Sequence, residues 1–419
     1  MEGFIPLMFA CVDTGMDQEE LNEMFTEYAD KPSVFDNKEA LTTNWNPDEI
    51  LHRDDQINEL ASILAPALKG EDPSNVFIYG SVGTGKTLIA RHVTGELGSV
   101  AQNQEADLDV VYVNCKMKKV SDTEYRLLAE LAREMGEEVP NTGLSTDEVY
   151  SRFFDALKGQ ESVVIVVLDE IDALVKKVGD DFLYNLTRIN DDLDDTRVSI
   201  LGISNDVSFT DYMDSRVESS LCEEEMIFPP YNALELSEIL EHRTNEGLKN
   251  GILEDGVISK VSALTASEHG DARKALNLLR VAGELAERGN EQNIAADHVD
   301  RAQEEIERNK IVETIRGQPK QSRLVLYTIL RMLEDDDTDQ VATGEVYSRY
   351  EEICSEAGES CITQRRVSDL ISELDMLGVI KAKVISKGAY GRTRQISVDH
   401  SSKIQRQLKN MVEDRFYLA

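Results

Sequence analysis

The chain has 419 residues and a formal net charge of −36, with 80 acidic residues against 44 basic ones. This length exceeds one ordinary domain, so two or three domains are expected. No apolar run is long enough to predict a membrane-spanning helix, and the five cysteines lack the close spacings of a zinc site or a disulfide framework. The composition therefore favours a multidomain protein of a reducing cytoplasm and no membrane partner.

The negative charge is unevenly distributed. Residues 1–319 hold 64 acidic and 29 basic residues, whereas residues 320–419 hold 16 and 15. An acidic excess spread over helix surfaces is typical of proteins from a high-salt cytoplasm, where screening weakens self-repulsion. An ordinary acidic protein is the alternative.

Residues 1–45 are predicted to form a partly disordered N-terminal tail. Its start is apolar but contains Glu2 and no Lys or Arg before Lys31, which argues against a secretory signal. Met16 is an alternative first residue. Residues 46–228 are then expected to form one α/β domain, which opens with a helix near 54–64.

A glycine-rich loop, Gly80–Thr87, follows the apolar run 75–79 and leads into a helical run. In such a loop, backbone N–H groups turn toward phosphate oxygens, Lys86 reaches the β- and γ-phosphates, and Thr87 offers its hydroxyl to Mg²⁺. A chance glycine-rich turn is the alternative, but the preceding strand and following helix argue against it. The predicted contacts with ATP or ADP in this region are Gly80, Val82, Gly83, Thr84, Gly85, Lys86, Thr87 and Leu88.

A second apolar strand, 163–168, ends in the acidic pair Asp169 and Glu170. Asp169 can hold the Mg²⁺ coordination sphere together with Thr87, and Glu170 can orient and polarise the water that attacks the γ-phosphate. An acidic pair after a strand is often only a solvated loop. Its position after a phosphate loop favours a nucleotide site.

Three further strands are expected at 109–113, 198–203 and 225–228. Strands that alternate with helices predict an α/β P-loop domain with a parallel sheet covered on both faces. Asn205 lies just beyond the strand 198–203, at the sheet edge where ligands gather, and is a candidate to bond the attacking water or the γ-phosphate. A turn residue is the alternative.

Pro229 and Pro230 mark a boundary, beyond which residues 229–316 show helical periodicity and predict a small all-α domain. Asp271 is the expected N-cap of a helix that carries Arg273 in its first turn. Taken alone, Arg273 is typical of a solvated surface charge.

Residues 317–419 predict a C-terminal winged helix-turn-helix of three helices and a hairpin with a glycine-rich tip. The third helix, 363–377, exposes side chains of the types that contact phosphates and base edges. Residues 363–398 carry seven basic and three acidic residues, a basic region in an acidic chain. A structural winged helix without DNA contact is the alternative. The candidate DNA-binding residues are Gln364, Arg365, Arg366, Ser368, Lys387, Arg392 and Arg394.

From about Leu41 to Val398 the chain resembles the archaeal origin-recognition initiators, the Orc/Cdc family of AAA+ ATPases. The resemblance is carried by the motifs GSVGTGKT, VLDEID, GISND, GDARKAL and TQRR. It implies an AAA+ base domain, a helical lid domain and a winged helix. It also implies an ATP-dependent replication initiator that binds double-stranded origin DNA, promotes loading of the replicative helicase and uses ATP binding with slow hydrolysis as a switch.

The resemblance implies roles for single residues as well. Asn205 and Arg273 would be sensors 1 and 2, and ATP would lie between base and lid beside Arg53 and Tyr231. The third helix of the winged helix would enter a major groove and its wing a minor groove, while inserted helices within 117–158 would add DNA contacts.

One departure concerns hydrolysis between copies. Many AAA+ relatives carry an arginine finger where this chain has Ser219 and Ser220, and Arg216 is the nearest substitute. Whether another initiator copy supplies an arginine for hydrolysis is therefore left open.

An Orc-type paralogue that holds nucleotide structurally and regulates transcription or origin choice is the alternative function. A clamp-loader subunit fits less well, because its C-terminal domain would be a helical collar. The expected location is the cytoplasm, in association with the nucleoid.

Overall fold

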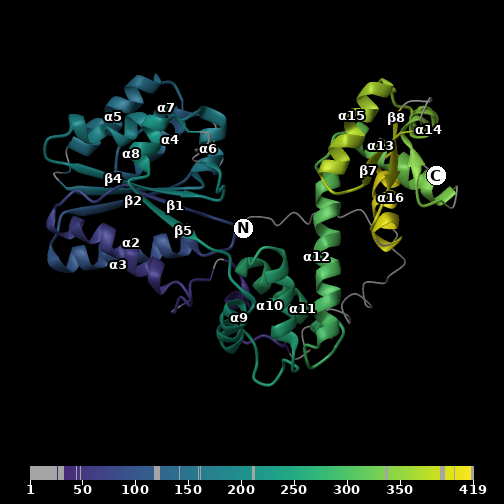
Figure 1. Cartoon of the computed structure of the whole chain (residues 1–419), viewed down its shortest axis with the longest axis horizontal. Coiled ribbons are helices and arrows are strands. Elements are labelled where there is room, and N and C mark those ends of the chain that lie inside the picture. The colour runs from purple at the N-terminus through teal and green to yellow at the C-terminus, as the bar shows by residue number, and fades with distance from the viewer. Residues whose placement is uncertain are drawn as a thin grey trace, which may run out of the picture. The chain divides into compact units, whose positions relative to one another are not determined.

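The computed structural model describes residues 26, 33–43, 45–47, 49–117, 123–140, 142–158, 160, 162–209, 213–335, 338–386, 392–400 and 402–416. The chain divides into two compact units, Met1–Val299 and Asp300–Ala419, and each is described by itself (Figure 1). Within the described residues, no helix combines the length and apolar character needed to cross a membrane.

The first unit contains a five-stranded sheet in the order β2-β3-β4-β1-β5, in which all neighbouring strands are parallel. The strands β3 and β4 are buried along almost their whole length, which is why β3 is a continuous run of Val, Ile and Leu rather than an alternating one. The predicted α/β fold with a parallel sheet is confirmed. The strands are β1 (Val76–Gly80), β2 (Leu108–Asn114), β3 (Val163–Asp169), β4 (Arg197–Ser204) and β5 (Glu224–Phe228).

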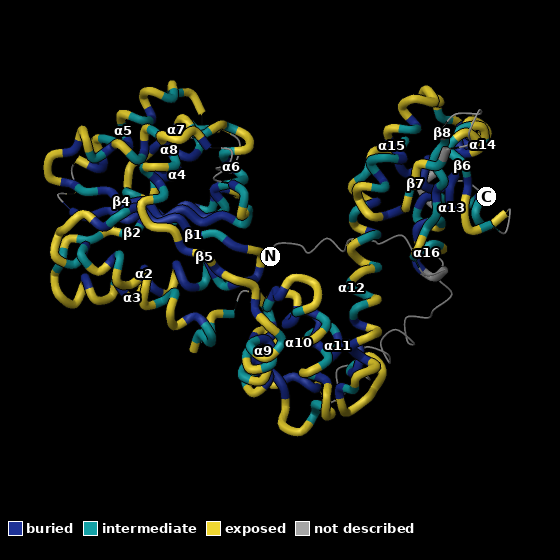
Figure 2. The backbone as a smooth tube through the Cα atoms, viewed as in Figure 1, coloured by how far each residue is buried: buried dark blue, intermediate teal, exposed yellow. Residues whose placement is uncertain are grey.

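Helices cover both faces of this sheet, and the buried strands lie between them (Figure 2). One face packs against α2 (Asp54–Leu64), η2 (Ala65–Lys69) and α3 (Lys86–Gln104). The other face packs against α4 (Glu124–Glu134), α5 (Thr146–Lys158), α6 (Ile171–Val178), α7 (Asp181–Thr187), η3 (Ile189–Asp192) and α8 (Ser215–Leu221).

A helical domain follows β5 in the same unit. It contains α9 (Ala233–Gly247), α10 (Val257–Glu268) and α11 (Ala272–Arg288), and α12 (Ala296–Arg316) runs across the boundary to the second unit. A capping box starts α9, in which Asn232 and Glu235 satisfy each other's backbone N–H groups.

Residues 33–43 pack on this helical domain, although they precede the sheet in the chain. Phe35 forms a β-bridge with Leu248, and its ring lies so close to Gly283 that a Cβ there would be 2.7 Å from Cζ. The short helix η1 (Lys38–Leu41) is held by Arg243, whose Nε donates to the Ala40 carbonyl over 2.6 Å. The sequence predicted a partly disordered tail over 1–45; these residues of it have defined structure, and the predicted domain boundaries stay a prediction.

The second unit is a winged helix, as predicted. Its core is centred on the buried rings of Tyr327 and Tyr350. The elements are α13 (Lys320–Asp335), β6 (Val341–Ala342), α14 (Thr343–Glu356), α15 (Gln364–Met376), β7 (Lys381–Ser386), β8 (Arg392–Ser397) and α16 (Ser402–Phe416), with the sheet order β6-β8-β7.

Replacing Phe35 with alanine should lower the free energy of unfolding by about 3 kcal/mol, because a buried ring is lost and a cavity is left. Urea denaturation of the full chain, followed by circular dichroism, measures this change. Leu234→Ala is the control, since Leu234 is 77% exposed on α9 and its truncation should cost less than about 0.5 kcal/mol. Equal stability of Phe35→Ala and the wild type would contradict the packing of residues 33–43.

Candidate functional site

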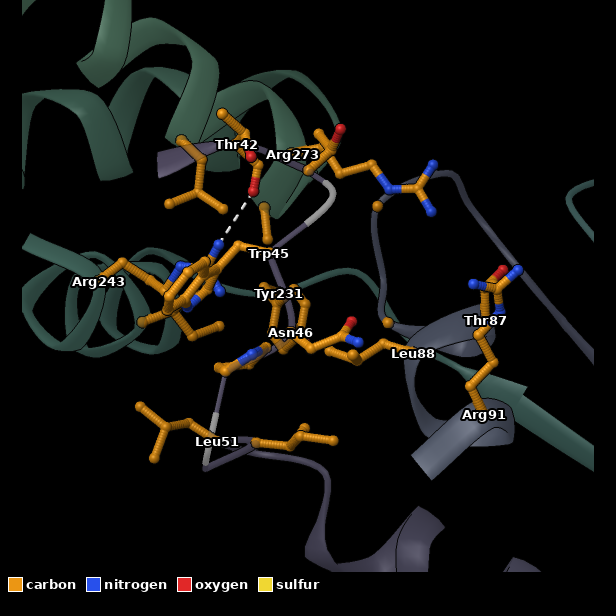
Figure 3. Close-up of a pocket in the computed structure, with 18 of the residues that line it drawn as sticks. Thr42, Trp45, Asn46, Leu51, Thr87, Leu88, Arg91, Tyr231, Arg243 and Arg273 are labelled. Atoms are coloured by element: carbon orange, nitrogen blue, oxygen red, sulfur yellow. Dashed lines mark hydrogen bonds between the residues drawn. The ribbon is translucent and has the colours of Figure 1, made fainter. Parts of the chain in front are cut away.

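A cavity of about 510 Å³ opens at the carboxyl edge of the parallel sheet, where it is bordered by the segment 42–51 and by helices α9 and α11. Thr87, Leu88 and Arg91 lie at one end of the cavity, and Trp45 and Arg243 lie at the other (Figure 3). The structure thus brings together many residues that the sequence singled out. The predicted site residues in the lining are Gly83, Gly85, Thr87, Leu88, Asp169, Glu170, Tyr231 and Arg273.

The phosphate loop has the backbone shape that its glycines predict. Gly83 and Gly85 have φ angles of +76° and +95°, a left-handed conformation that glycine adopts without the strain of a Cβ. Helix α3 begins directly at Lys86, so the unpaired N–H groups of its first turn, which carry the positive end of the helix dipole, face the loop. This is a ready-made environment for phosphate groups.

Lys86 places a positive charge inside the loop. Its Nζ donates to the carbonyls of Gly80 and Ser81 over 2.8 and 2.7 Å, and the side chain is almost fully buried. Burial, reinforced by the nearby Arg273, lowers the pKa of Lys86 to about 8. Because two carbonyl oxygens hold this ammonium, it is already positioned next to any anion that the loop binds.

Asp169 and Thr87 form the oxygen-rich part of the site. The Thr87 hydroxyl lies 3.1 and 3.2 Å from the two carboxylate oxygens of Asp169, which is buried at the end of β3. Tyr112 on β2 donates its hydroxyl to the same carboxylate, and burial followed by this hydrogen bond raises the pKa of Tyr112. Hydroxyl and carboxylate oxygens are the ligands that Mg²⁺ prefers, so the residues fit the predicted metal.

Glu170 and Asn205 meet at the ends of neighbouring strands. Asn205 Nδ2 donates to Glu170 Oε1 over 3.3 Å, and Lys116 Nζ lies 3.5 Å from the same oxygen. Glu170 has a φ of +55°, unusual for a residue with a side chain. Backbone strain of this kind collects at functional sites, and here it occurs at the residue that points a carboxylate into the cavity.

Comparisons with known proteins agree with this geometry. Family models match residues 69–205 (AAA domain), residues 237–304 (Cdc6 AAA+ ATPase-type lid domain) and residues 313–406 (CDC6, C terminal winged helix domain). The ORC1-type DNA replication protein 1 of Methanosarcina mazei is 50% identical over 395 residues, which cover 94% of each chain. The chain belongs to the ORC1-type family of DNA replication proteins.

Other members support the same assignment. The ORC1-type DNA replication protein of Thermococcus onnurineus is 50% identical over 388 residues, which cover 92% of each chain. The structure of the Aeropyrum pernix ORC1 protein in complex with DNA is similar with a TM-score of 0.78 at 43% identity, over 92% of this chain and 99% of that one. The AAA+ ATPase fold of this ORC1-type chain implies nucleotide binding.

Arg53, predicted to lie beside ATP, is packed against the phosphate loop, and its contact with nucleotide stays a prediction. Its guanidinium is buried and donates to the carbonyls of Thr84 (3.0 Å), Pro229 (2.7 Å) and His52 (2.8 Å), and it stacks on the Tyr231 ring at 3.8 Å. Burial lowers the pKa of Arg53. Arg53 supports the phosphate loop through the Thr84 carbonyl and is not among the described residues that line the cavity.

Four other predicted contacts, Gly80, Val82, Thr84 and Lys86, are also outside the described lining. Thr84 and Lys86 are buried beneath the loop surface, whereas Val82 is 48% exposed. Their contact with nucleotide stays a prediction.

The segment before Arg53 contributes cavity residues that sequence reasoning missed. The Trp45 indole donates to Glu246 over 3.1 Å. Arg243 donates to the Thr42 carbonyl over 3.0 Å (Figure 3). Both bonds attach the segment to lid helix α9. The single tryptophan of the chain, in an otherwise polar stretch, was the available signal. Tyr112 was missed too, because only the pairing of β2 with β3 brings it to Asp169.

Arg216 lies away from this cavity, on α8. It is exposed, forms an ion pair with Asp214 (Nε to Oδ1, 2.9 Å) and sits 5.1 Å from the Tyr184 ring centre. Its predicted action on the nucleotide of another copy stays a prediction.

Three of the five predicted DNA-binding side chains that the structure describes are exposed, and the other two, Ser368 and Arg394, are half-buried. Gln364, Arg365 and Arg366 are exposed on the first turn of α15, which Thr363 caps. Arg394 on β8 donates to the Ser368 carbonyl over 3.1 Å and to the Ser372 hydroxyl, so the wing is tied to the helix. Gln364, Ser368 and Arg394 also line a groove of about 350 Å³. Lys387 lies outside the described residues, and only the backbone of Arg392 is described.

Arg53→Ala should lower the free energy of unfolding of the nucleotide-free chain by about 3 kcal/mol, because the buried Thr84 carbonyl loses its donor and the Tyr231 ring loses its stacking partner. Nucleotide affinity should fall as well, since the loop loses its support. Thermal and urea denaturation measure the first effect, and titration with ADP measures the second.

Lys69→Ala is the control for Arg53→Ala. Lys69 is exposed on η2 and is not among the described residues that line the cavity, so its removal should leave the stability and the nucleotide affinity of the chain almost unchanged. A loss of affinity in Arg53→Ala at full stability would indicate a direct nucleotide ligand instead of a support for the loop.

Proposed function

We propose that this ORC1-type chain is an ATP-dependent replication initiator, which binds double-stranded origin DNA and promotes loading of the replicative helicase. Bound ATP or ADP, with Mg²⁺, sets the state of the protein, and slow hydrolysis resets it. The observation that carries the proposal is the shared cavity, whose lining combines Gly83 and Thr87 of the base with Arg273 of the lid.

The residues of the cavity have complementary roles in this proposal. Lys86 and the N–H groups of the loop hold the phosphates, and Thr87 and Asp169 hold Mg²⁺. Mg²⁺, when bound, neutralises charge on the phosphate oxygens. Glu170 orients the attacking water, with its carboxylate held by the Asn205 amide. The fixed carboxylate and the preformed loop support hydrolysis, while Arg273 contributes a cation from the lid.

The same geometry supports a switch. A ligand can shift a conformational equilibrium only when it contacts the two states differently. A nucleotide that touches both Gly83 on the base and Arg273 on the lid makes different contacts in two states that differ in the angle between base and lid. The bound nucleotide would therefore set the geometry that DNA and the helicase encounter.

The winged helix supports the DNA part of the proposal. The ORC1 protein of Aeropyrum pernix, 43% identical, has been solved in complex with DNA. In the present chain, Arg365 and Arg366 project from the start of α15 in a region with a surplus of basic residues. At high salt, counterion release contributes little, so direct base contacts and DNA shape would carry most of the specificity. Contacts with other initiator copies and with the nucleoid belong to the same proposal.

Lys86→Ala should abolish measurable binding of ATP and ADP, because the loop loses the only charge placed within it, while the full chain should still bind duplex DNA. Fluorescence titration with a labelled ATP analogue tests the first expectation. Lys69→Ala, an exposed lysine on η2, is the charge-matched control. Wild-type affinity in Lys86→Ala would refute nucleotide binding at this loop.

Arg365→Ala should weaken binding to duplex DNA about tenfold, in line with the loss of one contact to a phosphate or a base. Titration at several salt concentrations separates the two cases, because a lost phosphate contact reduces the salt slope by about one unit. Arg349→Ala removes an arginine of α14 that is paired with Glu352 and Asp335 and should have little effect. Unchanged DNA affinity in Arg365→Ala would contradict the assignment of α15.

Genome-wide mapping of the DNA bound by the chain tests the biological role. Occupancy at replication starts is expected. Occupancy spread over many promoters would instead identify an Orc-type regulator of transcription.

A further inference from the structure

Three consecutive residues of the phosphate loop, Gly83, Thr84 and Gly85, are each contacted by a different segment from outside the loop. Arg53 donates to the Thr84 carbonyl over 3.0 Å. The hydroxyl of Tyr231, at the junction of base and lid, lies 3.0 Å from the position of a Cβ on Gly85. Gly83 contacts the start of lid helix α11.

The contact at Gly83 leaves no room for a side chain. A Cβ at Gly83 would lie 1.7 Å from Oδ1 and 3.1 Å from Cα of Asp271. The next residue of the lid, Ala272, donates its N–H to the Gly83 carbonyl over 3.2 Å. The backbone at the start of α11 therefore contacts the backbone of the phosphate loop directly.

Asp271 also determines the conformation of the first turn of α11. Its Oδ1 accepts hydrogen bonds from the N–H groups of Arg273 (2.9 Å) and Lys274 (3.2 Å), and its own backbone is extended. The side chain is 7% exposed, so it is enclosed between the loop and the helix. One residue thus joins the contact with the loop to the backbone that carries Arg273.

The Arg273 side chain extends from this turn into the cavity and is exposed. An exposed arginine loses rotamer freedom when it binds an anion, and the net gain depends on how well its backbone is held beforehand. The docked and capped turn supplies this preorganisation.

We propose that Asp271 is a positioning residue, which fixes Arg273 relative to the phosphate loop and so lets the site distinguish a nucleoside triphosphate from a diphosphate. This inference rests on the proposed binding of nucleotide at Gly80–Thr87. The loop grips the phosphates that both nucleotides share, whereas a cation carried by the lid is needed for the additional terminal phosphate.

The test compares full-length variants by calorimetric titration with ADP and with a non-hydrolysable ATP analogue, each with Mg²⁺. Asp271→Ala removes the cap, and the preference for the triphosphate should fall about fivefold, which is the free energy usually lost with an N-cap expressed as a ratio of affinities. Affinity for ADP should stay within about twofold of the wild type. Asp271→Asn is the matched control, because asparagine caps helices as well as aspartate does, and it should keep the preference.

The variant Arg273→Ala completes a double-mutant cycle. If Asp271 acts through Arg273, the variant that lacks both side chains should show no greater loss of preference than Arg273→Ala alone. Amide hydrogen exchange at Arg273 and Lys274 in the ADP complex should be faster in Asp271→Ala and unchanged in Asp271→Asn.

Three results would overturn the inference. The first is an equal loss of affinity for both nucleotides in Asp271→Ala, which would indicate a purely structural role. The second is loss of the preference in Asp271→Asn, and the third is an unchanged preference in Asp271→Ala. A wild-type chain that binds neither nucleotide would refute the proposed function itself, and this inference with it.

Discussion

The parallel pairing of β1, β3 and β4 is the constraint on which the nucleotide site depends. Parallel strands end at the same edge of a sheet, and the register aligns Asp169 with Ile203 and Tyr79 with Ser204. The strand ends that carry the phosphate loop, the acidic pair and Asn205 therefore lie within one or two residues of the same level at the sheet edge. Because all three strands are buried among aliphatic side chains, a shift in register would cost free energy. The polar groups at the strand ends are therefore held in fixed positions.

The sequence predicted the parts of the site that are local. The loop Gly80–Thr87, the acidic pair after β3 and the cap at Asp271 each depend on a few consecutive residues, and their conformations follow from glycine freedom, strand burial and helix capping. The fold class and the winged helix could be predicted for the same reason, since they rest on repeated local periodicity.

The parts that could not be predicted depend on contacts between residues far apart in the chain. Arg53 reaches Pro229 across 176 positions, and Arg243 reaches Ala40 across 203. The sequence does not distinguish a buried arginine that donates to carbonyls from an arginine that contacts a ligand. Phe35 in an apparent tail and Tyr112 on β2 were overlooked for the same reason, because their partners are set by tertiary packing alone.

The placement of residues 33–43 on the helical domain has a mechanical consequence. The polypeptide crosses between this domain and the sheet domain twice, first ahead of Arg53 and again beyond Pro229. Two domains joined by one connection can rotate relative to each other about several axes. Two connections restrict this rotation chiefly to the line that joins them. A change in the angle between the two domains is therefore expected chiefly about this one axis.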